Sequence, residues 1–354
     1  MIVIVVVAIL GSIAALTYLV PYKRSHRRRA EIREILANLK SLASQPNYRE
    51  AAKDNIEFFR ATRSPFSYLW WLIFRAPKLR RNRTKIVELI DLPFPKWQKE
   101  VLETLSWFEV WMRILVPIRE RIIGELERLK KTKREPIVVA SIGCGGMELE
   151  RQVIYQLIRK RFNLPVIFIG VDYTQASFEV AAAKFKKLTT KGLVQLKTAS
   201  HLGNADLEKL KAKAASQKLQ LVFLKADAFD LKGLTEDSFD LVYHTRLRHH
   251  LTLEQAKQLD KLACHLAPRL VELDDLFSVP EIIIISIFTW RFPAVLNGAI
   301  FSYLKDFSKK EVLAKKKSGW EVSFSRKPFS CYLRVHDKVS PTAAEHGDGR
   351  DIIT

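Results

Sequence analysis

Glycines and carboxylates between residues 136 and 230 have the types and the spacing that a nucleoside-containing ligand requires. Gly143 and Gly145 follow the apolar run 137–142 and precede a stretch of helical character. Such a turn lets the backbone approach a ligand, and the helix N-terminus offers unpaired N–H groups to an anion. Asp172 follows a second apolar run, and a carboxylate there can accept hydrogen bonds from both hydroxyls of a ribose. Asp172 could instead cap the next helix.

The elements that must position these residues alternate between strand and helix from residue 136 onward. This rhythm predicts an α/β fold with a Rossmann-like, doubly wound, mostly parallel sheet and an antiparallel C-terminal strand. The expected domain spans residues 136–336, and the tail 340–354 is expected to be disordered. The expected strands lie at 137–142, 166–171, 221–225, 239–243 and 269–273, with a closing pair at 320–326 and 329–336, and the helices at 148–162, 175–188 and 254–266.

The first 21 residues have the composition of a membrane anchor. The run 2–20 is uncharged and apolar, and at about 1.5 Å per residue a helix of this length crosses a hydrocarbon core. Five lysines and arginines follow between positions 23 and 29, whereas a cleavable signal peptide carries its charges before the apolar run. By the positive-inside rule we expect a single-pass transmembrane anchor at 1–21 with the rest of the chain, including its catalytic domain, in the cytoplasm. A buried core helix is the alternative.

A basic, helical, membrane-proximal region is expected over residues 22–131. Within it, residues 65–74 include adjacent Trp70 and Trp71 and precede a basic cluster, which is typical of a helix at the headgroup level of a bilayer. A core helix of the N-terminal region is an equal alternative. A charged stretch ending at Pro136 marks the expected boundary with the sheet domain.

The composition indicates a globular protein with an anionic partner. The 354 residues include 59 lysines and arginines against 38 acidic residues, a net charge of +21. We assign much of this charge to an anionic membrane surface and less to nucleic acid. Three widely spaced cysteines show no CxxC or Cys/His metal spacing, so neither a disulfide framework nor a metal site is expected.

Four segments, in this order, resemble the class I S-adenosylmethionine-dependent methyltransferases. The resemblance covers about residues 136–336 and implies S-adenosyl-L-methionine as cofactor, without a metal. Two positions depart from the family pattern: Ser141 replaces the acidic residue common near the end of the first strand, and Met147 replaces the third glycine of the turn. A nicotinamide-binding domain, the competing interpretation, usually carries a fuller Gly-x-Gly-x-x-Gly turn. The four segments are 141–150, 167–172, 222–230 and 238–251.

The resemblance also implies which residues contact the cofactor. The turn would hold the methionine moiety, Asp172 the ribose, and Asp227 the adenine amino group, which needs a hydrogen-bond acceptor. Ala228 would lie against the adenine ring. The residues expected to bind the cofactor are Ser141, Gly143, Cys144, Gly145, Asp172, Tyr173, Asp227, Ala228 and Tyr243.

Candidate catalytic residues lie after the fourth and fifth strands. In the family the fourth strand ends beside the transferred methyl group, so the resemblance implies a reaction site lined by Tyr243, His244, Thr245 and His249. At most one of His249 and His250 is expected to be functional, because His250 could simply pack at or cap a helix start. Asp274 follows the fifth strand with other acidic residues, and a carboxylate there could act as general base or be a solvated loop residue.

The apolar insert 281–307 is expected to form part of a substrate cap. Arg291 and Pro293 interrupt it, so it is not a second transmembrane span. An apolar cap on an anchored enzyme indicates a lipophilic small molecule or lipid as methyl acceptor. Packing of the insert on the N-terminal region is the alternative.

The sequence thus predicts a membrane-anchored methyltransferase, and two other functions compete with it. The charge supports a nucleic-acid methyltransferase, but the fourth strand lacks the Asn/Asp-Pro-Pro-aromatic segment of amino-methylating enzymes, and no Pro-Cys nucleophile pair occurs. Ser141 and Met147 motivate the other competitor, a catalytically inactive scaffold that kept the fold.

Overall fold

The computed structural model describes residues 22–81, 86–111, 113–133, 136–214, 219–290, 292–314, 320–325 and 331–338. These residues form two compact units, and the border between them crosses helix α6 (Pro95–Trp111). Unit 1 takes in the described residues up to Val101 together with Phe277–Ser308, and unit 2 takes in Leu102–Leu276 and those from Lys309 onward.

Unit 2 is built on an eight-stranded sheet with the strand order β3-β4-β2-β1-β5-β6-β8-β7. Every neighbouring pair is parallel except β6 with β8 and β8 with β7, so β8 alone runs against the others. This confirms the α/β class and the mostly parallel sheet with an antiparallel C-terminal strand. The strands are β1 (Ile137–Ile142), β2 (Val166–Asp172), β3 (Gln195–Ala199), β4 (Leu219–Lys225), β5 (Leu241–Thr245), β6 (Arg269–Asp275), β7 (Trp320–Ser325) and β8 (Cys331–Asp337).

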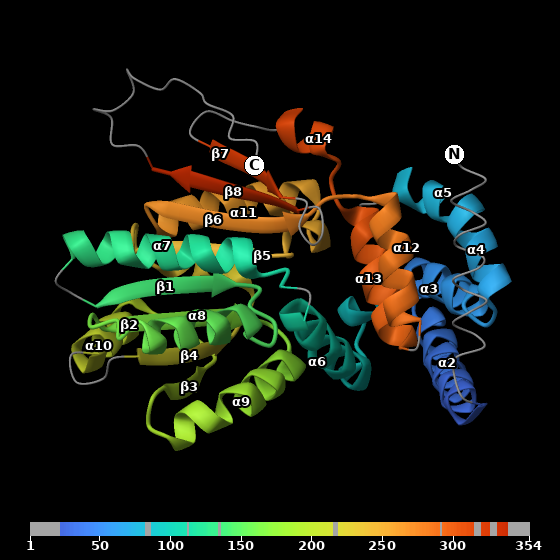
Figure 1. The fold of residues 1–354 in the computed structure, drawn as a ribbon, viewed down its shortest axis with the longest axis horizontal. Coiled ribbons are helices and arrows are strands. Elements are labelled where there is room, and N and C mark those ends of the chain that lie inside the picture. Colours follow the sequence, from blue (N-terminus) through green and yellow to red (C-terminus); the bar gives the residue numbers. More distant parts are fainter. Residues whose placement is uncertain are drawn as a thin grey trace. The chain divides into compact units, whose positions relative to one another are not determined.

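Helices cover both faces of the sheet, as Figure 1 shows. One core packs α7, α8 and α9 against β-strand side chains such as Val139 and Phe168, and a second core packs α10 and α11 against Ala140 and Ile169. Strand residues alternate between the two cores because successive side chains point to opposite faces. The helices of unit 2 are α7 (Val116–Thr132), α8 (Glu148–Arg159), α9 (Gln175–Thr190), α10 (Asn204–Ala214), α11 (Leu253–Leu266) and α14 (Lys309–Ala314), with the 3-10 turns η4 (Ala228–Gly233) and η5 (Arg248–His250).

The strand order places a topological switch point at β1. The strands that follow β1 first extend the sheet through β2, β4 and β3, and then through β5 on the other side. In open α/β sheets ligands bind outside the carboxyl ends of the strands at such a point. The glycine turn follows β1 directly, and Asp172 ends β2, so both lie at the edge where a ligand is expected.

Two elements of unit 2 lie in a segment to which the sequence assigned no structure. Strand β3 and helix α10 occupy the Lys-rich stretch between residues 188 and 221. Strand β3 is the edge strand, and its five side chains are exposed or half-buried, so it lacks the continuous apolar run that identified β1 and β2.

Unit 1 consists of helices around an aromatic core. The rings of Phe58, Tyr68, Trp71 and Phe301 pack against one another at centroid distances of 5.1–6.4 Å. The Asn297 amide donates to Asn55 Oδ1 at 2.9 Å within this unit. Its helices are α2 (Tyr22–Ala43), α3 (Arg49–Ala61), α4 (Pro65–Phe74), α5 (Ala76–Arg81), the start of α6, α12 (Val279–Thr289) and α13 (Pro293–Lys305), with the 3-10 turns η1 (Pro46–Tyr48) and η3 (Leu89–Asp91).

Helix α4 combines the two interpretations of the tryptophan-rich segment. Tyr68 and Trp71 are buried in the aromatic core, whereas Phe66 and Trp70 are exposed on the other side of the helix. The prediction of a core helix is therefore right for one face, and bilayer contact of the other face stays a prediction. The apolar insert forms α12 and α13, which belong to the same unit as the N-terminal helices. Its expected role as a substrate cap also stays a prediction.

The predicted localisation needs correction. Among the described residues, the longest apolar helices fall short of the length and hydropathy that crossing a membrane requires. This finding contradicts the prediction of a single-pass membrane protein with its catalytic domain in the cytoplasm, and we withdraw that prediction. The segment 1–21, on which the prediction depended, lies outside the described residues, as does the tail 340–354.

Candidate functional site

The glycine turn after β1 has the backbone conformation that its composition predicted. Gly143 and Gly145 have φ angles of 65° and 49°, in the left-handed region that favours glycine. The Gly143 and Cys144 N–H groups donate to the Val171 carbonyl, which ties the turn to the end of β2. A Cβ on Gly143 would come within 2.9 Å of the Leu247 side chain, so the turn lies close against the loop after β5.

Met147, the departure from the third glycine, points away from the turn. Its side chain is fully buried, and its Cε would lie 2.5 Å from a Cβ built on Gly170 of β2. The methionine therefore fills the core space that Gly170 leaves open and does not crowd a ligand at the turn. It does so at a φ of 54°, a conformation that costs a non-glycine residue roughly 1 kcal/mol.

Asp172 lies beside the turn, as the sequence predicted. Its Oδ2 accepts a hydrogen bond from the Gly145 N–H at 2.9 Å, and its Oδ1 accepts from the Thr174 N–H and hydroxyl. The N-cap of α9 is Thr174, whose hydroxyl accepts from the Ser177 N–H, so Asp172 is not the cap of that helix. The carboxylate is half-buried at the carboxyl end of β2, where a ribose would approach it.

The residues expected around the adenine lie at the next strand. Asp227 is exposed after β4 and caps η4 by accepting from the Phe229 N–H at 2.9 Å. Ala228 is half-buried beside it, and Tyr173 is exposed after β2. Because β4 pairs with β2, these residues share the edge of the sheet that carries Asp172.

Tyr243 lies inside the fold, and its predicted role at the cofactor and the reaction site stays a prediction. Its side chain is fully buried on the α8 face of the sheet, and its hydroxyl donates to Glu150 Oε1 at 2.8 Å. Ser141 lies opposite Tyr243 in the register of β1 and β5. Burial raises the pKa of Glu150, and hydrogen bonding from Ser141 and Tyr243 opposes that rise. These three side chains form a buried polar group between β1, β5 and α8, near enough to the turn for the charge of Glu150 to act on the Cys144 thiol.

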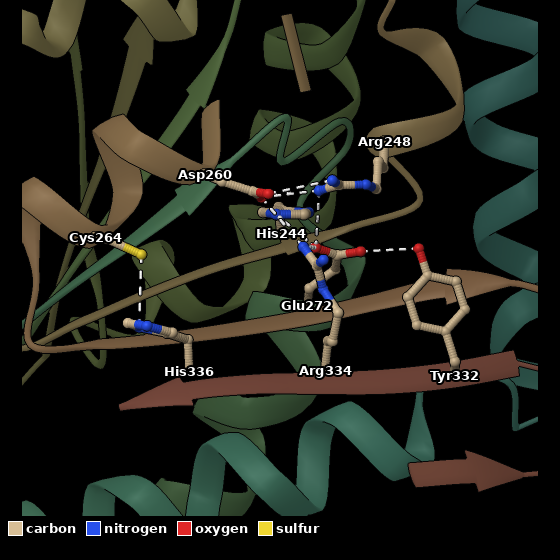
Figure 2. Close-up of polar contacts among 8 residues, drawn as sticks. All are labelled: His244, Arg248, Asp260, Cys264, Glu272, Tyr332, Arg334 and His336. Carbon is tan, nitrogen blue, oxygen red and sulfur yellow. Dashed lines mark hydrogen bonds and ion pairs between the residues drawn. The ribbon is translucent and has the colours of Figure 1, made fainter. Parts of the chain in front are cut away.

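His244 is fully buried within a charge cluster on the α11 face, and its predicted role at the reaction site stays a prediction. Figure 2 shows the guanidinium groups of Arg248 and Arg334 around the Glu272 carboxylate, with His244 beside them. Asp260 of α11 also accepts from both arginines, from Arg248 at 2.8 and 3.1 Å and from Arg334 at 3.1 Å. We name His244, Arg248, Asp260, Glu272, Tyr332 and Arg334 the sheet charge cluster.

Within the sheet charge cluster, the positive charges of the two arginines balance the negative charges of Asp260 and Glu272. Burial opposes ionisation of Glu272, but Arg334 and Arg248 outweigh it and lower its pKa to about 2. Burial lowers the pKa of His244, so this imidazole is neutral at neutral pH. Paired charges of this kind join β5, β6 and β8.

His249 and Asp274 do come together, as two of the predicted catalytic residues. His249 Nδ1 lies 2.8 Å from Asp274 Oδ1, and the Asp275 N–H donates to the same oxygen at 3.0 Å. Burial, followed by the charge of Glu272, raises the pKa of Asp274 to about 6. His250 is not the cap of α11, since Thr252 holds that position with its hydroxyl on the Gln255 N–H.

The loop after β5 is fixed to β6 and α11 by charged contacts. Arg246 pairs with Asp275 at 2.9 Å, Arg248 with Asp260 at 2.8 Å, and His249 with Asp274. Leu247 of the same loop lies against Gly143. The loop therefore holds the His249–Asp274 pair in a fixed place at the carboxyl ends of β5 and β6, next to the glycine turn.

The residues around the turn fit an adenosine ligand that carries positive charge. Two left-handed glycines leave the backbone open, and Asp172 presents a carboxylate at the tip of β2. The pKa of the Cys144 thiol is raised by burial and by the charges of Asp172 and Glu150, so both carboxylates act on the turn. Of these groups, the sequence missed Glu150, because an acidic residue in the first turn of a helix is ordinarily explained by the helix dipole.

Comparisons with known proteins give likenesses at the level of fold. No protein-family model and no curated protein matches the chain. The plantazolicin methyltransferase BamL is similar over 75% of this chain and 100% of that chain, with 11% identity and a TM-score of 0.42. A SAM-dependent methyltransferase from Aquifex aeolicus is similar over 61% of this chain and 89% of that chain, with 14% identity and a TM-score of 0.34.

The bifunctional kinase-methyltransferase WbdD is similar over 63% of this chain, with 12% identity and a TM-score of 0.37. This chain covers 39% of WbdD, about two-fifths of its length. All three TM-scores lie below 0.5, so the activity proposed for this chain rests on its own residues.

Proposed function

We propose that this protein is an S-adenosylmethionine-dependent methyltransferase. The observation that carries the proposal is the half-buried Asp172 carboxylate, held 2.9 Å from the Gly145 N–H at the switch point of the sheet. The left-handed glycines would admit the methionine moiety, Asp172 would hold the ribose, and Asp227 with Ala228 would hold the adenine. When bound, S-adenosylmethionine supplies an electrophilic methyl group on a sulfonium centre.

The chain's own catalytic group would be His249. Hydrogen bonding of Nδ1–H to Asp274 fixes the orientation of the ring and selects the tautomer in which Nε2 accepts a proton. His249 would therefore take the proton of an acceptor hydroxyl or acidic carbon as that atom gains the methyl group. Asp274 would act through His249, as a positioning residue. The other contribution of the fold is alignment of the two reactants and exclusion of water.

We propose a lipophilic small molecule or lipid as the acceptor. The support is the composition of the insert, whose helix α12 is apolar and exposes Val279 and Ile284. The measurement is incubation of the purified protein with lipid extracts and methyl-labelled S-adenosylmethionine, followed by mass spectrometry of the extract. Label in an RNA or DNA fraction instead would show that the acceptor class is wrong.

Cofactor binding is tested by isothermal titration calorimetry with S-adenosylhomocysteine on the wild type and on Asp172→Ala. Loss of hydrogen bonds to a charged group should weaken binding about ten- to hundredfold. Asp206→Ala is the matched control, because Asp206 also accepts a backbone N–H, from Gly203, but at the start of α10. Its affinity should stay within about twofold of the wild type.

Two results would contradict the proposal. A folded wild type that binds neither S-adenosylmethionine nor its product would support a catalytically inactive scaffold. Equal affinity of the wild type and Asp172→Ala would show that the ribose is held elsewhere. Thermal unfolding of both variants checks that a loss of binding is not a loss of folded protein, since Asp172 also accepts bonds from Thr174.

A further inference from the structure

Glu150, in the helix that the glycine turn opens, is a buried acid with one oxygen that lacks a hydrogen-bond partner among the described residues. Glu150 is the third residue of α8 and is 1% exposed. Its Oε1 accepts from the Tyr243 hydroxyl, whereas its Oε2 has no hydrogen-bond partner among the residues that the structure describes. A buried carboxylate oxygen without a donor is costly, so its retention calls for a donor or cation that binds there.

The position of Glu150 connects it with the proposed cofactor site. It lies in the first turn of the helix that the glycine turn opens, and its carboxyl group interacts with Ser141, two residues before Gly143. The Cys144 thiol feels the charges of both Asp172 and Glu150. Two carboxylates thus act on one short turn, and a ligand seated there gains from positive charge on the side that faces Glu150.

We propose that Glu150 binds the α-ammonium group of the cofactor's methionine moiety. Helix α8 thus supplies an acidic side chain beside Ser141, the position of β1 at which the acidic residue common in the resembled family is missing. The inference rests on the proposed function, since it concerns the same cofactor. Tyr243, on this proposal, is a positioning residue that holds the Glu150 carboxylate through its hydroxyl.

The test compares two ligands that differ in the group Glu150 would recognise. S-Adenosylhomocysteine carries the α-ammonium group, and 5′-methylthioadenosine has the same nucleoside and sulfur without the amino-acid part. We expect Glu150→Gln to weaken S-adenosylhomocysteine at least tenfold in calorimetric titration and to change 5′-methylthioadenosine by less than twofold.

Glu148→Gln is the matched control on the same helical turn. Glu148 is buried and pairs with Arg151 at 2.7 Å and with Lys184 at 3.4 Å. The Glu148→Gln variant should weaken the binding of both ligands equally or leave both affinities unchanged. The same selective loss in Glu148→Gln would overturn the assignment, because it would trace the effect to the overall charge of the helix start.

Other outcomes separate the inference from the proposed function. If Glu150→Gln binds both ligands as the wild type does, or weakens both equally, the Glu150 assignment is wrong and the cofactor proposal stands. If the wild type binds neither ligand, the proposed function fails and the assignment fails with it.

A second variant serves if Glu150→Gln does not fold. Tyr243→Phe keeps the carboxylate and removes its donor, which disfavours the ionised form. The other titratable groups acting on Glu150 and Tyr243 are Cys144 and Lys184. As the pH is lowered and the carboxylate takes up a proton, binding of S-adenosylhomocysteine should then weaken at a higher pH in Tyr243→Phe than in the wild type. Binding of 5′-methylthioadenosine should keep its pH profile. Identical profiles for the two ligands would overturn the proposal.

Discussion

Two buried glutamates on opposite faces of the same sheet behave in opposite ways. Glu272, on the α11 face, lies between two arginines, and its pKa is lowered to about 2. Glu150, on the α8 face, has a tyrosine hydroxyl at 2.8 Å and an unsatisfied oxygen, and its pKa is raised, with burial as the largest cause. Both side chains are at most 1% exposed.

The difference shows that burial alone does not assign a function to a carboxylate. Glu272 has partners for its charge within the chain, so its ionised state is explained by folding alone. Glu150 Oε1 accepts from a neutral tyrosine hydroxyl, and Oε2 has no hydrogen-bond partner among the described residues, so the remaining demand points to a ligand. The sequence missed Glu150, which lies in the first turn of α8, and the partners of the two glutamates are what distinguish them.

The largest expected effect comes from breaking the sheet charge cluster. Arg334→Met leaves Glu272 with Arg248 at 3.4 Å as its guanidinium partner and removes the stack of Arg334 on Trp320. Removing one partner of a buried ion pair costs roughly 3–5 kcal/mol in the free energy of unfolding. Urea unfolding at pH 7 measures the loss.

The matched control is Lys211→Met, which removes a pair with Glu208 on the surface of α10 at 2.8 Å. Surface pairs of this kind contribute under about 1 kcal/mol. If Arg334→Met costs no more than Lys211→Met, the sheet charge cluster is not what holds β6 and β8 together. The double variant Arg334→Met with Glu272→Gln should recover part of the loss, because it leaves no unpaired carboxylate.

The second prediction concerns the pH dependence that Glu272 contributes. Its folded pKa of about 2 lies below an unfolded value of about 4.3, so the unfolded chain binds the proton more readily. The stabilisation is complete above about pH 5 and is lost as pH falls toward 2, and two units correspond to roughly 3 kcal/mol. The difference in unfolding free energy between the wild type and Glu272→Gln should therefore shrink as the pH is lowered from about 5 to about 2. A constant difference would contradict the low pKa.

The sequence predicted the strands that carry the site more accurately than the contacts within it. Apolar runs located β1 and β2 to within one residue, because buried parallel strands are continuously apolar. Asp172 beside Gly145 followed from the same pattern. The direction of Tyr243 and His244 did not, since neighbouring strand residues face opposite sides of the sheet and the sequence alone does not say which side a ligand uses.

The partners of those side chains come from distant parts of the chain. Glu272 meets Arg334 because β8 pairs antiparallel with β6, in a register that no local pattern in the sequence specifies. Met147 is a second case: it replaces the third glycine of the turn, and Gly170 on the neighbouring strand provides the space for its side chain. Contacts across the sheet therefore decide which strand-end residues are structural.

The smallest expected effect, and the sharpest for the comparison, is the pH dependence of Glu150→Gln. The folded pKa of Glu150 is raised, so its contribution to stability is present at low pH and is lost as pH rises through that pKa. Glu150→Gln should therefore gain in unfolding free energy relative to the wild type as pH rises, opposite in sign to Glu272→Gln. Saturating S-adenosylhomocysteine should reverse the order, because a ligand stabilises the folded state by its affinity and the wild type binds it more tightly. If Glu150→Gln is less stable at every pH and gains as much from the ligand as the wild type does, then both glutamates are structural and the contrast between the two faces disappears.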